Sequence, residues 1–537
     1  MFSKKFKKIS GIVLSLVLTL SLTACGSTSN DIGQDTSKKI VNVGVTYAPG
    51  NINPLSPNGE VATYATGLLF LPLVELDSDM KFQPMLAESI TTEDNLTFTI
   101  KIDEKATWTD GTPVTSDDVI FTIKQIANPK VGSIYAYVYS VFEGFDESGY
   151  IEEGVTDIPG VIRVDDKTLQ LVAKEPLSLT TFQNSVGRYL WTIPEHALKD
   201  IAPEDLVASE FFQNPTVTSG PFTLISYDRD HYVQFAANKD YFKGAPKIDQ
   251  MNFNVMQGTQ IYARLQSGEI DMTIPTLAMV PVTDYDAILS LENVTATVDK
   301  PITNQYVYIN ENVIPDAKVR KAFVYAINRQ RIVDELLLGN GEVIDGFFTS
   351  YSPYFDNSLS VTEYNPEKAK ELLAEAGWDS NKEITISVSS GDETFIQAAN
   401  IVAANLNEVG VKAKIKVTDF ATLLDELYSM NYDLGVIQYT FVPVDPYPDI
   451  SYLLQEGNVN GYYNEEVNNL LAQVKSEDDF DTINEIYARI NQIAAEEVPM
   501  FSVYAPSSIG VVSKRLSGVE AKAYGTFINV HEWDIVQ

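Results

Sequence analysis

Alternating apolar and polar positions in the first half of the chain predict short strands joined by turns. In the segment 96–102, LTFTIKI, every second residue is apolar, so one face of a strand can be buried. The segments 161–172 and 220–238 each hold two such runs around an aspartate-rich turn, which predicts two β-hairpins. One amphipathic helix interrupts the strands, with Thr115 or Ser116 as its N-cap. The chain up to about residue 300 is therefore predicted to be mainly β.

The pattern changes near residue 301, where helix and strand signals begin to alternate. Apolar residues at helical spacing predict one helix over 316–337 and another over 365–378, with Asn365 as N-cap and Pro366 at its first position. Strands and helices then follow in turn, at 383–388, 394–410, 411–417, 421–430 and 433–439. Such alternation predicts a parallel sheet flanked by helices.

The segment 438–449, QYTFVPVDPYPD, comes at the end of the last of these strands and contains three prolines. Proline is poorly tolerated inside strands and helices, so the part that follows the strand, 440–449, is predicted to be a loop. In open α/β sheets, ligands bind beyond the carboxyl ends of the strands. By its position the segment is either the rim of a binding site or an ordinary connection.

The first 24 residues have the features of a secretory signal peptide. Lysines precede an apolar run from Ile12 to Leu22, which is shorter than the roughly 20 residues that span a bilayer. The run is followed by Thr23-Ala24-Cys25, which resembles a bacterial lipobox, whose cysteine receives a lipid and becomes the new N-terminus. The alternative is an ordinary signal peptide with an incidental cysteine. Residues 25–40 carry few large apolar side chains and predict a flexible tether.

We therefore expect an extracytoplasmic protein that lipid on Cys25 anchors to the cell membrane, at the outer face of the cytoplasmic membrane or in the periplasm. Cys25 is the only cysteine, so a disulfide within the chain is excluded. No other segment is a candidate for crossing the membrane.

Composition and charge narrow the classes of function. The chain has 73 acidic and 38 basic residues and a formal charge of −35, which argues against partners such as nucleic acid or anionic lipid. Three histidines and one cysteine make a metal site unexpected, and no cofactor is expected. No G-x-S-x-G nucleophile motif is present, and the HEWDI segment has Ile535 where a zinc protease carries its second histidine. We therefore do not expect an enzyme.

Six blocks of sequence resemble the extracellular solute-binding proteins of ABC importers, family 5, which includes oligopeptide- and dipeptide-binding lipoproteins. The blocks occur in the order of that family, at 106–122, 219–249, 265–272, 318–333, 369–378 and 487–504. The resemblance implies an α/β fold of the two-lobed, periplasmic-binding-protein type (class II), with an extra subdomain in lobe I. It places lobe I at 41–62, 215–300 and 500–537, the subdomain at 63–214 and lobe II at 301–499.

The same resemblance implies the function. The two lobes, joined by crossing strands, would close on a ligand and deliver it to a membrane permease with its ATPase. In the peptide-binding relatives, an extended peptide pairs through its backbone with strands of both lobes. Carried over to this chain, the ligand-binding residues are Asn58, Gly59 and Glu60 in lobe I, Tyr135 and Tyr137 in the subdomain, and Gln438, Tyr439 and Thr440 in lobe II. The protein is expected to act as a monomer.

One position departs from the family pattern. The peptide-binding relatives carry an aspartate three residues before an acid-proline pair, and it binds the amino-terminal ammonium of the peptide. Here the pair is Asp445-Pro446, and Val442 stands three residues before it. Either Asp445 or Asp449 takes that role from a shifted loop, or the ligand has no free amine.

Other ligands and roles fit the same fold. An oligosaccharide could stack on Tyr439, Phe441 and Tyr447 of the 438–449 segment, and a metal complex is a further alternative. A receptor role is also open, since some members of the family pass on a ligand or a signal. Permease and ATPase genes next to this one would favour import.

Overall fold

The computed structural model describes residues 38–57, 59–155, 157–390 and 393–536. The predicted signal peptide, Cys25 and most of the tether lie outside the described residues, as does Asn58. Among the described helices, none has the length and the apolar character that crossing a membrane requires.

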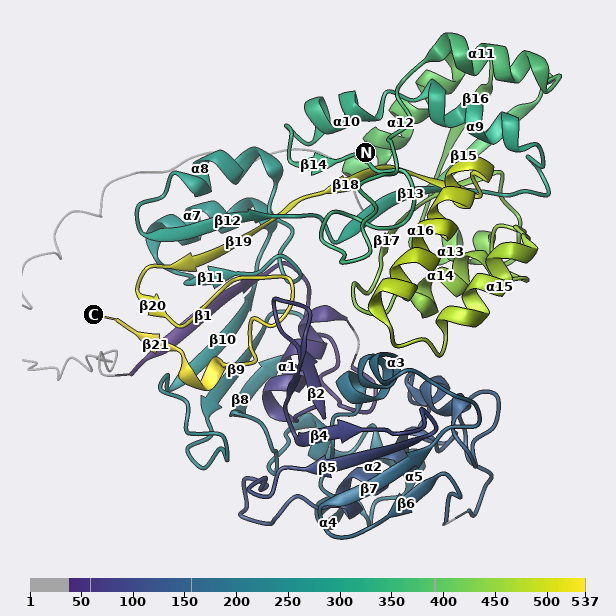
Figure 1. Ribbon diagram of the computed structural model, residues 1–537. Helices are drawn as coiled ribbons and strands as arrows, with labels where there is room; N and C mark the ends of the chain where they lie inside the picture. The colour runs from purple at the N-terminus through teal and green to yellow at the C-terminus, as the bar shows by residue number, and fades with distance from the viewer. Residues whose placement is uncertain (1–37, 58, 156, 391–392, 537) are drawn as a thin grey trace, which may run out of the picture. The chain divides into compact units, whose positions relative to one another are not determined.

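Lobe I is built on a mixed sheet of seven strands (Figure 1). Strand β1 is parallel to β10 and β11, and the other neighbours are antiparallel. In spatial order the strands are β12 (Val294–Asp299), β19 (Ser508–Ser513), β11 (Met272–Thr273), β1 (Ile40–Val45), β10 (Gln250–Val255), β9 (Tyr232–Ala237) and β8 (Phe222–Asp228). The accompanying elements are α1 (Glu60–Leu69), η3 (Gly258–Gln260), α7 (Ile261–Ser267), η4 (Val282–Asp284), α8 (Tyr285–Leu289), η5 (Val530–Glu532) and the pair β20 (Leu516–Ser517) and β21 (Asp534–Ile535).

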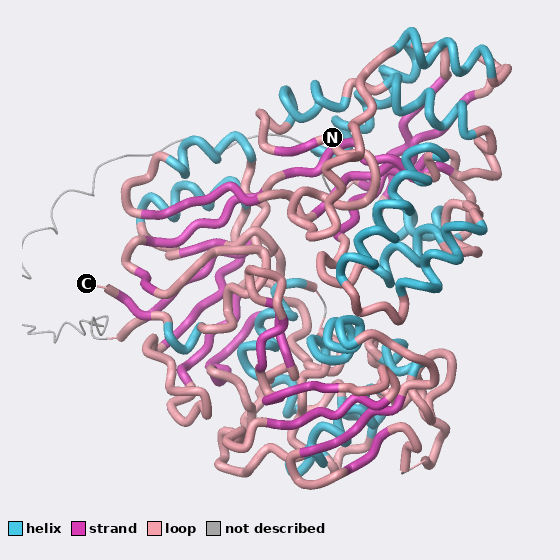
Figure 2. The backbone as a smooth tube through the Cα atoms, viewed as in Figure 1, coloured by secondary structure: helices cyan, strands magenta, loops and turns pink. Residues whose placement is uncertain are grey.

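The subdomain has an antiparallel sheet of four strands, and loops make up much of the rest (Figure 2). The sheet order is β4 (Ala87–Thr91), β5 (Thr97–Ile102), β7 (Thr168–Val172) and β6 (Val161–Arg163). Its other elements are β2 (Val74–Leu76), β3 (Phe82–Pro84), α2 (Ser116–Ile126), η1 (Ala136–Val141), α3 (Leu179–Phe182), η2 (Gln183–Gly187), α4 (Glu195–Leu198), α5 (Pro203–Leu206) and α6 (Glu210–Gln213). One hydrophobic core runs through this sheet and one face of the lobe I sheet, so the subdomain and lobe I share buried surface.

Three predictions in this half are confirmed. The two hairpins are β6–β7 and β8–β9, both antiparallel. Helix α2 starts after Thr115, and the Asp118 side chain accepts a hydrogen bond from the Thr115 backbone at 2.9 Å, which completes a capping box. The strand predicted at 96–102 is β5.

Lobe II has a sheet of six strands between two layers of helices (Figure 1). The strands, in spatial order, are β14 (Gly341–Glu342), β18 (Met500–Pro506), β13 (Thr303–Ile309), β17 (Leu434–Thr440), β15 (Glu383–Ser389) and β16 (Lys412–Thr418). Its helices are α9 (Ala317–Ala326), α10 (Arg329–Leu336), α11 (Pro366–Glu375), α12 (Glu393–Glu408), α13 (Phe420–Tyr428), α14 (Tyr447–Leu454), α15 (Glu465–Val474) and α16 (Phe480–Glu497).

Strand β13 shows how the sequence divides these layers, because successive side chains of a strand point to opposite faces. Val307 and Ile309 pack into the core under α9, α10, α11 and α12. Tyr306 and Tyr308 pack into the core under α13, α14, α15 and α16. All of these positions are buried, as expected for a central strand covered on both faces.

Lobe II confirms the alternation of strands and helices after residue 301 and corrects two details. Strand β15 is parallel to β16 and β17, as predicted, but β13, β18 and β14 extend the sheet with antiparallel pairs. The single helix predicted over 316–337 is wrong: α9 ends at Ala326, and α10 starts at Arg329. The break arises because the Asn328 side chain accepts a hydrogen bond from the Arg331 N–H at 3.0 Å and so caps a new helix.

The prediction that 440–449 is a loop is wrong at both ends. Thr440 still belongs to β17, and α14 starts at Tyr447. Pro446 is the N-cap of α14, and Pro448 lies in its first turn. The first backbone N–H groups of a helix have no partner within the helix, so prolines at these positions remove no hydrogen bond.

Two short segments carry the chain between the two large sheets. Residues 300–302 connect β12 to β13, and Ser507 connects β18 to β19. The strands are neighbours in each sheet, β12 beside β19 and β13 beside β18, so the two crossings run next to each other. The predicted division assigned 500–537 to lobe I, but β18 pairs with β13 and belongs to the lobe II sheet.

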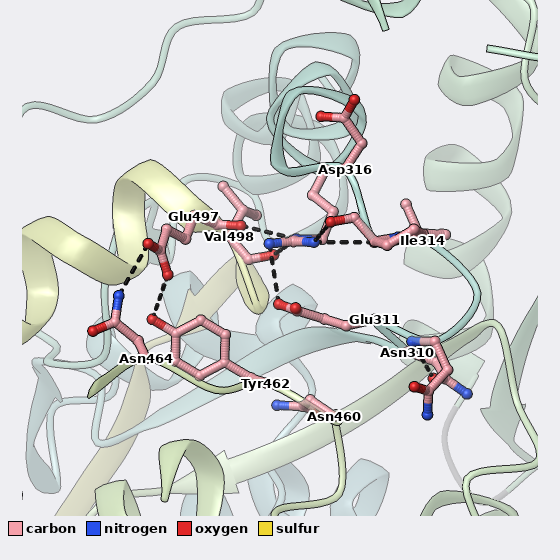
Figure 3. Close-up of polar contacts among 12 residues, drawn as sticks. Asn310, Glu311, Ile314, Asp316, Asn460, Tyr462, Asn464, Glu497 and Val498 are labelled. Carbon is pink, nitrogen blue, oxygen red and sulfur yellow. Dashed lines mark hydrogen bonds and ion pairs between the residues drawn. The ribbon is translucent and has the colours of Figure 1, made fainter. Parts of the chain in front are cut away.

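Buried polar contacts hold together the lobe II elements that precede the second crossing, and Figure 3 shows Tyr462 and Asn464 bound to Glu497. The Arg320 Nε donates to the backbone oxygen of Glu497 at 2.8 Å, and its Nη2 lies 3.1 Å from Glu311 Oε1. The Glu497 carboxylate accepts hydrogen bonds from the Tyr462 hydroxyl at 2.7 Å and the Asn464 amide at 3.0 Å. These contacts connect α9 with the end of α16, immediately before β18, and so support the strand that crosses between the sheets.

Candidate functional site

A cavity of about 1370 Å³ lies between lobe I, the subdomain and lobe II. Its lining includes both crossing segments, represented by Ile302 and Ser507. Eight of the ten ligand-binding residues predicted from the sequence line it: Gly59, Glu60, Tyr135, Tyr137, Gln438, Thr440, Val442 and Asp445. Asn58 lies outside the described residues, and Tyr439 is not part of the lining.

Among the described residues, the end of strand β17 has no partner on its β15 side, where it borders the cavity. It pairs with β13 along its whole length, but with β15 only as far as Val436, opposite Val388. From residue 437 to 440 the described residues provide no strand on the β15 side. Gln438 and Thr440 are exposed and line the cavity, although they belong to a central strand. The backbone there can therefore accept one more strand.

Successive side chains of β17 point to opposite faces of the sheet, which explains why Tyr439 points into lobe II and not into the cavity. Its ring packs against Phe441 and stacks on Tyr452, and its hydroxyl donates a hydrogen bond to Asp449 at 3.0 Å. Phe441 is buried in the same core of lobe II. Of the three aromatic residues considered for stacking on a sugar, only Tyr447 lines the cavity.

Asp445 and Asp449 are the carboxylates of lobe II in the cavity lining. The Asp449 side chain also accepts a hydrogen bond from the Val442 N–H at 3.0 Å, which fixes the turn after β17. Burial raises the pKa of Asp449 to about 6, and the hydrogen bonds from Val442 and Tyr439 oppose that rise. With both oxygens engaged, Asp449 acts as a support for the loop.

Asp445 has a different environment. Asp445 is 6% exposed, and its Oδ2 has no hydrogen-bond partner among the described residues. Burial raises the pKa of Asp445 to about 6, and hydrogen bonds from Thr181 and from the Tyr447 backbone oppose the rise. A buried carboxylate oxygen without a donor is costly unless a ligand supplies one, so Asp445 is the better candidate to receive a cationic group.

The lobe I wall begins at Gly59, the N-cap of α1, whose φ of 98° is a conformation that glycine adopts readily and other residues rarely do. Glu60 follows as the first residue of that helix. In the subdomain the ring of Tyr135 stacks on that of Tyr189, with centroids 5.5 Å apart and planes at 20°. The Trp191 ring meets both edge-on at 5.7 Å.

Several lining residues were missed by the sequence reasoning. Arg188 donates from Nε to Glu75 Oε1 at 2.6 Å, and its guanidinium lies over the rings of Tyr189 and Tyr524 at 5.4 and 5.8 Å. These residues come from distant parts of the chain and carry no local motif. Arginines are mostly exposed in proteins, and nothing in the sequence around Arg188 marks it as a residue of the cavity wall.

Polar contacts also connect the subdomain to lobe II beside the cavity. Lys475, a lining residue, forms an ion pair with Glu175 at 3.1 Å. The Asp478 carboxylate accepts hydrogen bonds from the Asn95 amide at 2.6 Å and from the Leu179 backbone at 3.2 Å. The cavity is thus bounded by direct contacts between the two walls as well as by the two crossing segments.

Two sheets joined by adjacent crossing segments, with a large cavity between them, define a two-lobed solute-binding protein. Residues 81–461 match the family model described as bacterial extracellular solute-binding proteins, family 5, and the chain belongs to that family. The fold class inferred from the sequence is thereby confirmed, and the family's description places the protein outside the cytoplasm.

Relatives and solved structures agree with this assignment. The chain is 26% identical to the oligopeptide-binding protein AppA of Bacillus subtilis, over 98% of this chain and 99% of the relative. It is 26% identical to the dipeptide-binding protein DppE of the same organism, over 96% and 97% of the two chains. The structure of Bacillus subtilis AppA in complex with a nonapeptide has a TM-score of 0.73 at 25% identity, and the match covers 93% of this chain and all of that one.

Proposed function

We propose that this protein is the lipid-anchored solute-binding component of an ABC importer, and that it captures an extended peptide between its lobes. Cys25 would carry the lipid, the lobes would close about the two crossing segments, and a permease with its ATPase would receive the peptide. The relatives named for oligopeptide and dipeptide binding support a peptide as the ligand.

The observation that carries this proposal is the unpaired edge of β17 at residues 437–440, on the wall of the cavity. A peptide that adds a strand there is held by its backbone, which explains how one site can accept many sequences. Hydrogen bonds to main-chain groups do not depend on the identity of the side chains.

The size of the cavity agrees with an oligopeptide. Its volume of about 1370 Å³ exceeds the range of about 300–1,000 Å³ that is usual for small-molecule pockets. Most of a small metabolite's surface would remain in contact with water in such a space. A peptide of several residues can fill it, as the nonapeptide of AppA illustrates for a relative.

A melting experiment tests the class of ligand. A mixture of unblocked pentapeptides is expected to raise the melting temperature of the protein, because a ligand that binds only the folded state stabilises it by mass action. N-acetylated pentapeptides should raise it less if a carboxylate of the cavity binds the amino-terminal ammonium. A shift with oligosaccharides and none with either set of peptides would reject the proposal.

Amide-to-ester substitutions test the mode of binding. Replacing a single backbone N–H of a bound pentapeptide by an ester oxygen removes one donor and leaves every side chain in place. At positions that pair with the protein backbone, we expect the Kd to rise about two- to tenfold, which corresponds to the loss of one hydrogen bond. If the esters at all positions bind as tightly as the parent peptide in calorimetric titrations, strand addition is wrong.

A further inference from the structure

The charged side chains that line the cavity do not balance. Among the described residues of the lining, four carboxylates, of Glu60, Glu75, Asp445 and Asp449, stand against two cations, Arg188 and Lys475. Both cations already have acidic partners. Arg188 is bound to Glu75, and Lys475 forms its ion pair with Glu175, which is outside the lining. The cavity therefore keeps an excess of negative charge.

Glu60 is one of the carboxylates without a partner. Among the described residues no donor forms a hydrogen bond or an ion pair with its side chain, which is exposed to the cavity. Its surroundings still disfavour the charge. Partial loss of hydration inside the cavity raises the pKa of Glu60, the Arg188 guanidinium opposes the rise, and Glu75 adds to it. The Asp445 carboxylate accepts hydrogen bonds from Thr181 and from the Tyr447 backbone, but its buried Oδ2 has no donor among the described residues.

Aromatic rings line the same cavity as Glu60. Besides burial, the Glu60 charge contributes to the raised pKa of Tyr64 and of Tyr135. Tyr135 belongs to the stacked pair with Tyr189, and Trp191 closes the group. All these rings line the cavity. A cavity lined by a carboxylate and by tyrosine and tryptophan rings suits a guanidinium or an ammonium group, through an ion pair and cation–π contacts.

The net charge of the whole chain also favours cationic ligands. A formal charge of −35 produces a negative potential, and a cleft with low-dielectric walls concentrates it. Cationic ligands are attracted to such a cleft, and anionic ligands are repelled from it.

A purely structural role for Glu60 would be stabilisation of α1, because an acidic residue in the first turn interacts favourably with the helix dipole. That role would not distinguish one peptide from another. The carboxylates that remain in the cavity after Asp445 is assigned to the amino-terminal ammonium point instead to a ligand that brings further positive charge.

We infer that the cavity selects peptides with a lysine or arginine side chain, and that Glu60, which lines the cavity together with the Tyr135 and Tyr189 rings, sets this preference. The inference rests on the proposed peptide-binding function and deepens it. The amino-terminal ammonium is common to all unblocked peptides, so it does not produce selection. A basic side chain does.

The test uses peptides Ala-Ala-X-Ala-Ala with X as arginine, as its neutral isostere citrulline, or as glutamate, and with X also moved to each other position. In calorimetric titrations with the full mature chain, the best arginine peptide is expected to bind about tenfold or more tightly than its citrulline counterpart, and the glutamate peptide least tightly. Glu60→Gln should reduce the ratio between arginine and citrulline peptides to about threefold or less. Glu60→Asp, which keeps the charge, should retain part of the preference.

Glu520→Gln is the matched control. Glu520 is exposed and outside the cavity lining, so its replacement changes the net charge equally and should leave the ratio as in the wild type. If citrulline and arginine peptides bind equally well to the wild type, the selectivity is rejected and the peptide function stands. If Glu60→Gln folds normally and keeps the full ratio, Glu60 is not its origin. If no peptide binds, both proposals fail.

Discussion

Replacing Arg329 by alanine is expected to lower the free energy of unfolding by about 3–5 kcal/mol, the usual cost of breaking a buried ion pair from one side. The side chains of Arg329 and Asp345 are 2% and 8% exposed, and Nη2 lies 2.6 Å from Oδ1. The guanidinium also donates to the backbone oxygens of Ile344 at 2.9 Å, Ser502 at 3.1 Å and Thr362 at 3.0 Å. Its removal leaves a buried carboxylate and three carbonyl groups without this donor.

Urea unfolding followed by circular dichroism would measure the change. The matched control is Arg331→Ala on the same helix α10, because Arg331 pairs with Glu335 at 3.0 Å while both side chains are about two-thirds exposed. An exposed pair of this kind contributes about 0.3–0.5 kcal/mol. If both variants lose the same free energy of unfolding, burial does not make the Arg329–Asp345 ion pair more important for stability than an exposed pair.

Asp445→Asn is expected to act in opposite directions on stability and on binding. In the absence of a ligand the variant should melt at a higher temperature near pH 7, because it no longer buries a charge whose Oδ2 lacks a donor. The affinity for unblocked peptides should fall about 10- to 100-fold, the effect of losing a charge-assisted hydrogen bond to the ammonium group. N-acetylated peptides should lose less. A variant that binds both kinds of peptide like the wild type would show that Asp445 is not the amine anchor.

The pH dependence gives an independent check on Asp445. In the folded chain the pKa of its carboxyl is raised from 3.8 to about 6, and burial is the main cause. Between these two values the folded state binds more protons than the unfolded state, so this group's contribution to stability is present at low pH and is lost as the pH rises from about 4 to 6. The pKa of Asp449 is also raised from 3.8 to about 6, so its contribution to stability is lost over the same pH range.

We therefore expect the melting temperature of the ligand-free wild type to fall between pH 4 and 6 more steeply than that of Asp445→Asn. Affinity for an unblocked peptide should increase in the wild type as the pH rises through 6, because the carboxylate becomes charged. Asp425→Asn is a suitable control, since Asp425 is exposed on α13 and does not line the cavity. Identical pH profiles for wild type and Asp445→Asn would contradict the assigned environment of this carboxyl group.

The sequence by itself determined the local elements and the class of protein. Turn residues and period-two alternation located the hairpins β6–β7 and β8–β9, and the caps at Thr115 and Asn365 located the starts of α2 and α11. These features depend on neighbouring residues, so a single chain is enough to predict them. The ordered blocks identified the family, and residues carried over from it, such as Gln438 and Tyr135, do line the cavity.

Only the tertiary structure decided which groups face the cavity, and whether those groups are buried or paired. The direction of Tyr439 follows from the register of β17 against β13, and the open edge of β17 follows from where β15 stops pairing. The environment of Asp445 depends on Thr181, which lies in the subdomain, far away in the chain. Burial, pairing of distant strands and the balance of charge in a cavity are properties of contacts between remote residues. Local sequence patterns do not encode those contacts, because each arises only when the whole fold brings its members together.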